Sequence, residues 1–508
     1  MRGSAKRASP GKPGVAFSMN RRDFLVGSSQ VLGASALLGR EANAQPGKTY
    51  RPNVIWLIAD QWRAQAIGAN GDPNAITPNL DRLCSSGINF DQARSGFPLC
   101  CPFRGSMLTG RYPNHMVPGH EYPLPQGQET IANLFNDAGY YTGYFGKWHL
   151  DGFHEKDGRA AMHIVPPDRR GGFKTWVGYE NNNSPWDSWV HGGAGKDAFH
   201  YRLPGYETDA LTDLFIKHIE ERAADRTGAD SKPFFAVLSV QPPHDPYIAP
   251  AKYMGHFNAE QVRLRPDVPQ FANMAPIGAT EVFGQKISVE ELARQELAGY
   301  YAQIENWDTN VGRIVDTLSR LQLLTNTHIM IFADHGDMHG SHGQFRKTTP
   351  YEESTRIPMI VSGEVSFYDQ RSTGRRGTLF SQVDIAPTTL GLCGLSVPSW
   401  MEGHSYSGSR LRFQPTPSEP DSMYLQNVVA TGHPDSVDEP YRGLVTRDGW
   451  KYVCFENQTW LMFNLNEDPY EQVNVAFNAQ YRAERNQLIA RLKQWVADTG
   501  DKFQLPSY

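Results

Sequence analysis

The sequence predicts an α/β fold, with a mostly parallel central sheet flanked by helices and a small C-terminal α+β subdomain. Continuous apolar runs indicate strands that are buried on both faces, and these runs occupy residues 53–59, 234–240 and 329–333. Amphipathic helical patterns lie between them. The alternation of the two kinds of element favours a parallel sheet covered by helices on both faces.

The first elements follow in order along the chain. After the first strand, a helix begins near Thr77 or Asn79 and ends at Gly87, because Thr and Asn cap helices and Gly ends them. Residues 129–139 form a second amphipathic pattern that ends on glycine. Residues 140–150 then predict a strand that runs into a polar loop.

The second half of the chain continues this pattern and then changes. Residues 289–321 carry the longest helical pattern, with apolar side chains at three- and four-residue spacing, and 357–363 is a further strand. A Ser- and Pro-rich segment at 407–420 is typical of a linker. Beyond it, residues 441–455 are strand-like and 478–498 form a closing helix, so we expect a separate C-terminal subdomain.

Charge and hydropathy exclude two kinds of partner. The chain has 508 residues and a formal net charge of −5, so it offers no basic field for the phosphates of a nucleic acid. Past residue 44, no apolar run is long enough to cross a bilayer. We therefore expect no nucleic-acid partner and no stable membrane span.

Residues 1–44 predict a twin-arginine signal peptide. The Arg21–Arg22 pair precedes an apolar stretch from Phe24 to Leu38, and small residues at 42–44 form a cleavage site. The alternative is a chance arginine pair before a membrane anchor, which the short, glycine-containing stretch disfavours. We expect recognition by the twin-arginine export machinery and a periplasmic or extracellular location.

The cysteines do not form a disulfide framework, because they are odd in number and scattered: Cys84, Cys100, Cys101, Cys393 and Cys454. A disulfide between the adjacent Cys100 and Cys101 would need a strained ring. The pair also lacks the Cys-x-x-Cys spacing of a zinc site. A reactive cysteine is the sharper remaining hypothesis.

Polar side chains follow the apolar runs at equivalent positions. Asp60, His149, His244 and Asp334–His335 each fall just after a predicted strand. Ligands bind at the carboxyl ends of the strands in open α/β sheets. We therefore expect these side chains, which are remote in sequence, to meet in one site.

Several of these groups can hold a divalent cation. Asp60, Asp334 and His335 offer carboxylate oxygens and an imidazole, and the Gln61 carbonyl is adjacent. Each aspartate alone is more simply a turn former, but the set at equivalent strand ends favours a metal site. Four other residues, taken singly, would be structural histidines or surface charge: His149, His244, Lys147 and Lys347.

Residues 100–111, CCPFRGSMLTGR, resemble the signature of the type I sulfatases, Cys-x-Pro-x-Arg followed by Thr-Gly-Arg. Cys100, Pro102 and Arg104 take the motif positions. Similar stretches run in the family's order from residue 52 to 476, among them GYFGKWHL, PPHDPY and FADHGDMHGSHGQFRK. The resemblance implies an alkaline-phosphatase-like fold with a sulfatase catalytic domain over residues 50–405 and a C-terminal subdomain over 421–508.

The resemblance also implies a sulfuric ester hydrolase in which a formylglycine-generating enzyme converts Cys100 to Cα-formylglycine. One hydroxyl of the hydrated aldehyde attacks the sulfur of a sulfate ester, and the alcohol leaves. The second hydroxyl is then deprotonated, so that the carbonyl re-forms and sulfate is expelled. A serine could perform the first step but would need water for the second.

Roles for the other residues follow from the same resemblance. One divalent cation, usually Ca²⁺ in sulfatases with Mg²⁺ or Mn²⁺ as alternatives, is held by the formylglycine oxygen and by Asp60, Gln61, Asp334 and His335. Lys147 and Lys347 contact the sulfate oxygens, and Arg104 orients the modified residue. His149 is the candidate base for sulfate release, and His244 the candidate acid for the leaving alcohol.

Two departures keep alternatives open. Many sulfatases have Asp-Asp where this chain has Asp60-Gln61, and the Asp-Gln-Trp-Arg form also resembles phosphonate monoester hydrolases and phosphodiesterases of the same superfamily. An inactive, sulfatase-like sugar-binding protein is a third reading, although every position that the chemistry requires holds a competent residue. Cys101 occupies a motif position where small residues are common, and we interpret it as a buried filler.

Residues 176–193, WVGYENNNSPWDSWVHGG, bear on the substrate. Their aromatic and amide side chains suit the apolar faces and hydroxyls of sugar rings, although the tryptophans can equally pack on the core. With the preceding VPPDRRGGF, the segment is similar to an insertion in sulfatases suspected of acting on polysaccharides. We expect a sulfated carbohydrate, or another sulfate ester, as the substrate.

Overall fold

A computed structural model describes residues 50–225, 232–269, 287–365, 373–415, 418–432 and 437–507. These residues belong to one compact unit. The predicted signal peptide, residues 1–44, lies outside the described residues and stays a prediction. No helix in the described ranges combines the length and the apolar character needed to span a membrane.

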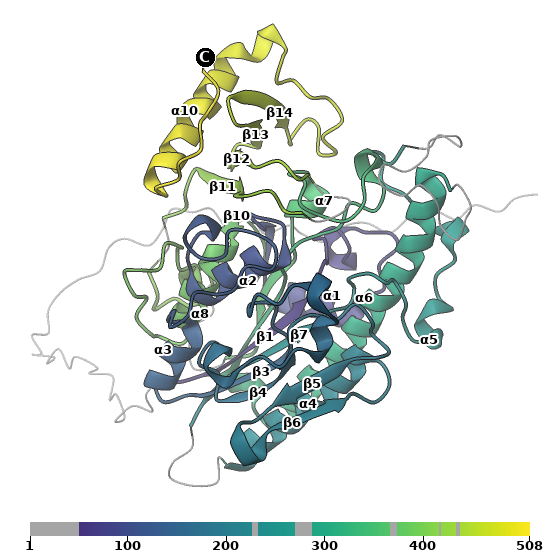
Figure 1. The fold of residues 1–508 in the computed structure, drawn as a ribbon, viewed down its shortest axis with the longest axis vertical. Coiled ribbons are helices and arrows are strands. Elements are labelled where there is room, and N and C mark those ends of the chain that lie inside the picture. Colours follow the sequence, from purple (N-terminus) through teal and green to yellow (C-terminus); the bar gives the residue numbers. More distant parts are fainter. Residues whose placement is uncertain are drawn as a thin grey trace, which may run out of the picture. The chain divides into compact units, whose positions relative to one another are not determined.

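A ten-stranded, mostly parallel sheet forms the centre of the fold, with the strand order β10-β2-β9-β8-β1-β7-β3-β4-β5-β6 (Figure 1). Its strands are β1 Asn53–Ala59, β2 Ile88–Arg94, β3 Tyr141–Lys147, β4 Thr175–Tyr179, β5 Trp189–Gly192, β6 Phe199–Arg202, β7 Phe234–Val240, β8 Thr327–Ala333, β9 Met359–Ser362 and β10 Gly374–Ser381. Only β9 and the β5–β6 end run antiparallel to their neighbours. The predicted sheet is therefore confirmed.

The central strands end level with one another. Ala59, the last residue of β1, lies opposite Val240 of β7 and Ala333 of β8. All residues of these three strands are buried, as their continuous apolar runs predict. The residues that follow the three strands therefore emerge at one edge of the sheet.

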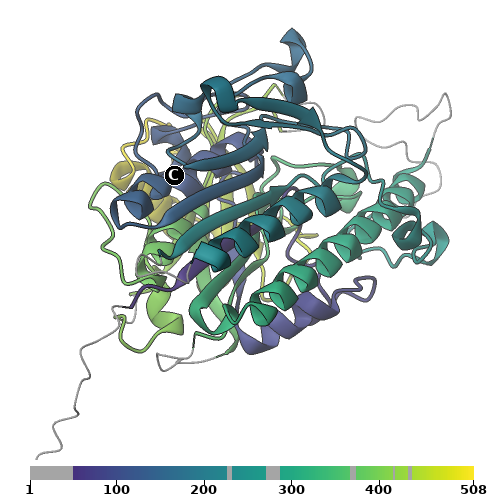
Figure 2. The same cartoon turned by 90° about the horizontal axis from the view of Figure 1, so that it is seen from below.

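Helices cover both faces of the sheet (Figures 1 and 2). On one face lie α1 Pro78–Ser86, α4 Glu207–Ala224 and α6 Val289–Arg320, with the short α5 Ala251–Met254 against α6. On the other lie α2 Cys100–Thr109, α3 Ile131–Asp137 and α8 Ile385–Leu392. Thr77 takes the N-cap position of α1 as expected, but Asp308 of α6 accepts the Leu80 N–H at 2.8 Å and satisfies that helix end.

A four-stranded antiparallel sheet follows, confirming the small C-terminal sheet. Its strands are β11 Ser422–Asn427, β12 Tyr441–Thr446, β13 Trp450–Phe455 and β14 Gln458–Asn464, paired in sequence order. The closing helix α10, Arg482–Asp498, packs on this sheet through Leu488, Ile489 and Leu492. The domain boundaries at 405 and 421 stay predictions.

The interpretation of 407–420 as a linker is wrong for its first residues. Residues 407–410 form the short helix α9 (Ser407–Arg410), which packs against α8. Arg410 and Leu411 are buried, and the Arg410 guanidinium donates to the Gly363 carbonyl. The Ser and Pro content of this segment is that of a linker, but its buried arginine fixes it to the main sheet.

Candidate active site

Four neighbouring parallel strands, β8, β1, β7 and β3, bring the predicted residues together at one edge of the sheet. Asp334 follows β8, Asp60 follows β1, and Lys147 ends β3. His244 lies in the loop after β7. Asp60, Lys147 and Asp334 are fully buried, because the strands that position them lie in the middle of the core.

Helix α2 places Cys100 among these groups, since Cys100 is the first residue of the helix. Its Sγ lies 3.2 Å from His335 Nε2 and 3.7 Å from Asp60 Oδ1. The ammonium nitrogens of Lys147 and Lys347 lie at 3.9 and 3.8 Å from the same sulfur. The partial positive charge of a helix N-terminus adds to these cations, so an anion is favoured at this position.

A group of four side chains can hold a cation here. The ligand atoms of Asp60, Cys100, Asp334 and His335 all lie within 4.8 Å of one another. Two carboxylates and one imidazole suit Ca²⁺, Mg²⁺ or Mn²⁺ better than a soft ion. The protein donors at the predicted metal site therefore have the chemistry that the sequence suggests.

Arg104 holds the two carboxylates in place. Its Nη2 donates to Asp334 Oδ2 at 3.0 Å and to Asp60 Oδ2 at 3.3 Å. Its Nη1 donates to the Lys147 carbonyl at 2.9 Å and to Ser239 Oγ at 3.0 Å. One fully buried guanidinium thus joins four strand ends from its place on α2.

The charges around residue 100 shift the pKa values of its neighbours. Burial raises the pKa of Asp60, but Lys147, whose Nζ lies 2.6 Å from Asp60 Oδ2, helps to bring it well below its usual value. Burial and Asp60 likewise raise the pKa of the Cys100 thiol. Lys147, Lys347 and His335 more than offset them, so that this pKa is lowered.

Lys347 and His244 form a second group beside Cys100. Lys347 Nζ lies 2.7 Å from His244 Nε2 and donates to Gln61 Oε1 at 2.8 Å. Burial and the adjacent Lys347 lower the pKa of His244 to about 4. His244 is therefore a neutral imidazole at neutral pH, in contact with a lysine that donates to it.

The Gln61 side chain contacts this second group rather than Asp60 and Asp334, although the Gln61 backbone N–H donates to Asp334 Oδ1 at 3.1 Å. Its amide nitrogen donates to Asp337 Oδ2 at 2.6 Å and to Asp245 Oδ1 at 3.2 Å. With its amide oxygen accepting from Lys347, Gln61 links the two halves of the site. Its role as a metal ligand stays a prediction.

His149 is buried just beyond Lys147, where its backbone adopts a positive φ of 57°. Its Nδ1 has no hydrogen-bond partner among the described residues. Burial, Lys147 and His120 together hold the pKa of His149 well below its ordinary value. The His149 ring is therefore neutral at neutral pH, with one nitrogen that no described residue occupies.

Sequence reasoning missed several residues at the site. Asp245 and Ser239 contact Gln61 and Arg104 respectively, and His120 lies edge-on to His149 with ring centroids 5.6 Å apart. A signal existed for the first two, because Asp245 follows His244 and Ser239 interrupts an apolar strand. His120 lies in an irregular loop with no pattern that marks it.

In the segment 176–193, some side chains pack in the core and others remain accessible for a sugar ring. Trp176 is buried with the Arg170 guanidinium 4.8 Å from its ring, and Asn182 donates to Ser188 and Glu207 inside the protein. Trp186 is 44% exposed. Core packing therefore explains Trp176 and Asn182, whereas Trp186 packs edge-on against Tyr206 and keeps part of its ring exposed.

Comparison with known proteins identifies the family. The model of the family described as sulfatase matches residues 52–395, and that of the N-sulphoglucosamine sulphohydrolase C-terminal region matches residues 340–498. An ulvan-active sulfatase of Formosa agariphila is 31% identical, with 91% of this chain and 84% of the relative aligned. An N-acetylglucosamine-6-O-sulfatase of Bacteroides thetaiotaomicron is 25% identical, with 92% and 90% aligned.

Solved structures agree. The yidJ sulfatase structure of Bacteroides fragilis superposes with a TM-score of 0.77 at 27% identity, over 90% of this chain and 98% of that one. A phosphonate monoester hydrolase of Agrobacterium radiobacter shares the fold, with a TM-score of 0.68 at 23% identity over 88% and 96% of the two chains. The chain therefore belongs to the sulfatase family, sulfuric ester hydrolases with the alkaline-phosphatase-like fold.

Proposed function

We propose that this protein removes sulfate from a sulfated carbohydrate, with Cys100 as formylglycine and one divalent cation, Ca²⁺ by preference, at Asp60, Asp334 and His335. One observation carries the proposal: the side chain of residue 100 faces the metal-capable group and two lysines at once. When formed, the formylglycine supplies a hydrated aldehyde whose hydroxyl is the nucleophile toward sulfur.

The chain's own residues supply the remaining chemistry. Lys147, Lys347 and the N-terminus of α2 surround the position of residue 100 with positive charge, which stabilises the sulfate group and the charge that develops on it. Arg104 fixes Asp60 and Asp334, so no reorganisation is needed during the reaction. His149 accepts a proton during sulfate release.

His244, which contacts Lys347 beside Cys100, is the candidate acid for the leaving oxygen. An anionic group in the site favours the charged imidazolium, so substrate raises the pKa of His244 from about 4 toward the working pH. Lys347 Nζ lies 2.7 Å from Nε2 of the same ring and holds it in place. His244 and Lys347 therefore serve the leaving alcohol as a pair.

The substrate class rests on the relatives and on one exposed side chain. Relatives in the same family are named for ulvan and for N-acetylglucosamine 6-O-sulfate. Trp186, which is 44% exposed on the segment between β4 and β5, offers a flat apolar surface on which a sugar ring can stack. These observations support a sulfated sugar as the substrate.

Two measurements test this function. Peptide mass spectrometry over residues 95–111, on protein from the native host, should show the aldehyde mass at Cys100; only unmodified cysteine would favour the sugar-binding alternative. Parallel assays of aryl sulfate, phosphodiester and phosphonate ester should give the highest kcat/KM for the sulfate. A dominant phosphodiesterase or phosphonate activity would overturn the assignment. Defined sulfated oligosaccharides then identify the linkage.

We also propose that the protein is exported through the twin-arginine pathway to the periplasm or beyond. The Arg21–Arg22 pair before the apolar stretch supports this location. Fractionation of cells that express the wild type and a variant with both arginines changed to lysine tests it. The variant should stay in the cytoplasm, and equal export of the two proteins would contradict the proposal.

A further inference from the structure

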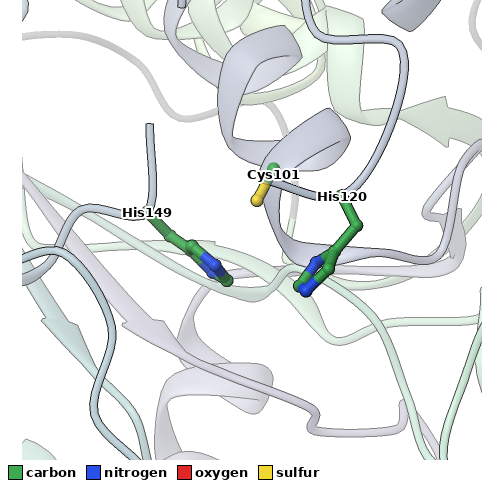
Figure 3. A group of neighbouring side chains, drawn as sticks. All are labelled: Cys101, His120 and His149. Atoms are coloured by element: carbon green, nitrogen blue, oxygen red, sulfur yellow. The ribbon is translucent and has the colours of Figure 1, made fainter. Parts of the chain in front are cut away.

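A second cluster of metal-ligating side chains lies next to the candidate active site and shares one residue with it. Cys101 is the second residue of α2, His120 comes from the loop between α2 and α3, and His149 follows β3. The Cys101 sulfur and one nitrogen from each ring lie within 4.8 Å of one another. Figure 3 shows the three side chains pointing toward a common space.

The cluster is enclosed. Cys101 is fully buried and His149 is 3% exposed, while the His120 side chain is 20% exposed and lies at the open side. Successive residues of a helix point about 100° apart, so the Cys101 sulfur faces this cluster while the Cys100 sulfur faces Asp60 and His335. The two adjacent cysteines therefore belong to two different groups of ligands.

Two features suit this cluster to an ion. His149 Nδ1 is buried without a hydrogen-bond partner among the described residues, so the site contains a ring nitrogen that no described group uses. The Cys101 sulfur accepts the Glu121 backbone N–H at 3.3 Å, and such a donor supports the negative charge that a coordinating thiolate carries.

The donor set selects the class of ion. One thiolate and two imidazoles suit Zn²⁺, Cu⁺ and Co²⁺, whereas the carboxylate-rich group around Cys100 suits harder cations. A tetrahedral ion with these three ligands keeps one position for water. The ion displaces the thiol proton of Cys101, which passes to solvent.

We propose that Cys101, His120 and His149 form a second, inhibitory metal site for a soft or borderline ion such as Zn²⁺. Metal binding at this site is inferred from the positions of the three side chains alone. The inhibitory part rests on the proposed function, because an ion on the His149 ring removes the proton acceptor for sulfate release. A cation there also adds positive charge that disfavours a proton on the same ring.

Cobalt spectroscopy tests the binding. In a Cys100→Ala protein, which removes the other nearby thiol, Co²⁺ should give the near-ultraviolet absorption of a cobalt–thiolate bond at one equivalent. The band should vanish when Cys101→Ala is added and persist when Cys84→Ala, a buried cysteine elsewhere, is added instead. No band in the Cys100→Ala protein, or a band that survives Cys101→Ala, would overturn the site.

Zinc titration tests the inhibition on the formylglycine-containing enzyme with the harder cation in excess. Because a general base contributes about 100-fold or more, one equivalent of Zn²⁺ should lower kcat at least about 100-fold, and a chelator should restore it. His120→Ala should lose this sensitivity, measured as the ratio of rates with and without Zn²⁺ within each protein. Equal inhibition of both proteins would place zinc elsewhere and overturn the proposal.

The two proposals fail separately. An enzyme with no sulfatase activity before zinc is added contradicts the proposed function, and the cobalt band still decides whether the site binds metal. An active enzyme that binds one zinc at Cys101 yet keeps its full rate contradicts the inhibitory role alone.

Discussion

Arg104 connects the two carboxylates with the ends of β3 and β7 through hydrogen bonds from one planar guanidinium. A lysine keeps the charge but cannot donate in all these directions. We expect Arg104→Lys to lower kcat/KM for a sulfate ester by about 10- to 100-fold, because partners that orient metal ligands contribute on this scale. Steady-state kinetics at saturating metal measure the change.

The matched control for this substitution is Arg82→Lys on the exposed side of α1, where the guanidinium donates only to Asn79 among the described contacts. That variant should keep the wild-type rate. An Arg104→Lys enzyme with an unchanged kcat/KM would show that the carboxylates hold their positions without the guanidinium.

His328 predicts how stability depends on pH. Burial, with a smaller contribution from Arg410, lowers the pKa of this β8 histidine to about 3, against about 6.5 in the unfolded chain. As pH falls below about 6.5, the unfolded chain takes up a proton that the folded protein does not. Stability is therefore lost as pH falls, at about 1.4 kcal/mol per pH unit for this group.

His328→Gln should remove the contribution of this histidine to the pH dependence of the free energy of unfolding. Urea unfolding at pH 7.5 and pH 5 measures it, and the variant should lose less stability between the two than the wild type. Between pH 7.5 and 9, where histidine is neutral in both states, the two proteins should change in parallel. Identical slopes at acid pH would contradict the assignment.

At the scale of elements, the β3–β7 pair sets the position of Lys147. Gly146 has a φ of +103°, and a Cβ there would meet the Ser239 carbonyl oxygen at 2.0 Å. We expect Gly146→Ala to lower the free energy of unfolding by roughly 2–4 kcal/mol. It should also lower kcat/KM, because it displaces Lys147 and Ser239. Denaturant unfolding and kinetics measure the two effects.

Gly377 on β10 provides the control, since an added Cβ there meets nothing within 4 Å. Gly377→Ala should be close to neutral in both measurements. If Gly146→Ala were equally neutral, the two strands would have room that the structure does not show.

The elements best predicted from the sequence are those with a simple burial pattern. The strands β1, β7 and β8 are buried on both faces, and their sequences are continuous apolar runs. Helix α6 is long enough for its periodicity to be clear. Helix α2 gives no such signal, because all ten of its residues are buried and no polar face marks the period.

The same reasoning explains what was predicted of the site. Asp60, Asp334 and His335 were predicted because the strands before them are unmistakable, and Cys100, Arg104, Lys147 and Lys347 because their motifs are similar to those of a family. His120 lies in an irregular loop, where no periodicity fixes the direction of a side chain. Its position depends on tertiary packing that a pattern does not encode.

At the scale of the whole molecule, the C-terminal sheet supports the segment that carries Lys347. Tyr441 of β12 donates to the Thr348 carbonyl at 2.9 Å, and Lys451 of β13 donates to the Pro350 carbonyl at 2.8 Å. Lys451 also pairs with Glu352, in the short helix α7 Glu352–Thr355, and with Glu471. The small sheet is thus part of the active-site scaffold.

Removal of the ammonium of Lys451 tests this support. Lys451→Met leaves two buried carboxylates without their shared partner, so we expect a loss of about 3–5 kcal/mol in the free energy of unfolding. Lys493→Met on the exposed side of α10 is the control and should be nearly neutral. A Lys451→Met protein as stable as the wild type would show that Arg94 alone compensates Glu352.

The burial of Cys100 has a consequence for the order of events during synthesis. The residue is 1% exposed at the start of a helix without a single exposed residue, so no modifying enzyme reaches its side chain once the pocket has closed. Asp334, which forms one wall, is made more than 200 residues later, a delay of roughly 10–50 s at ordinary translation rates. Any modification of residue 100 therefore competes with folding of the chain, and it must be complete before the side chain is buried.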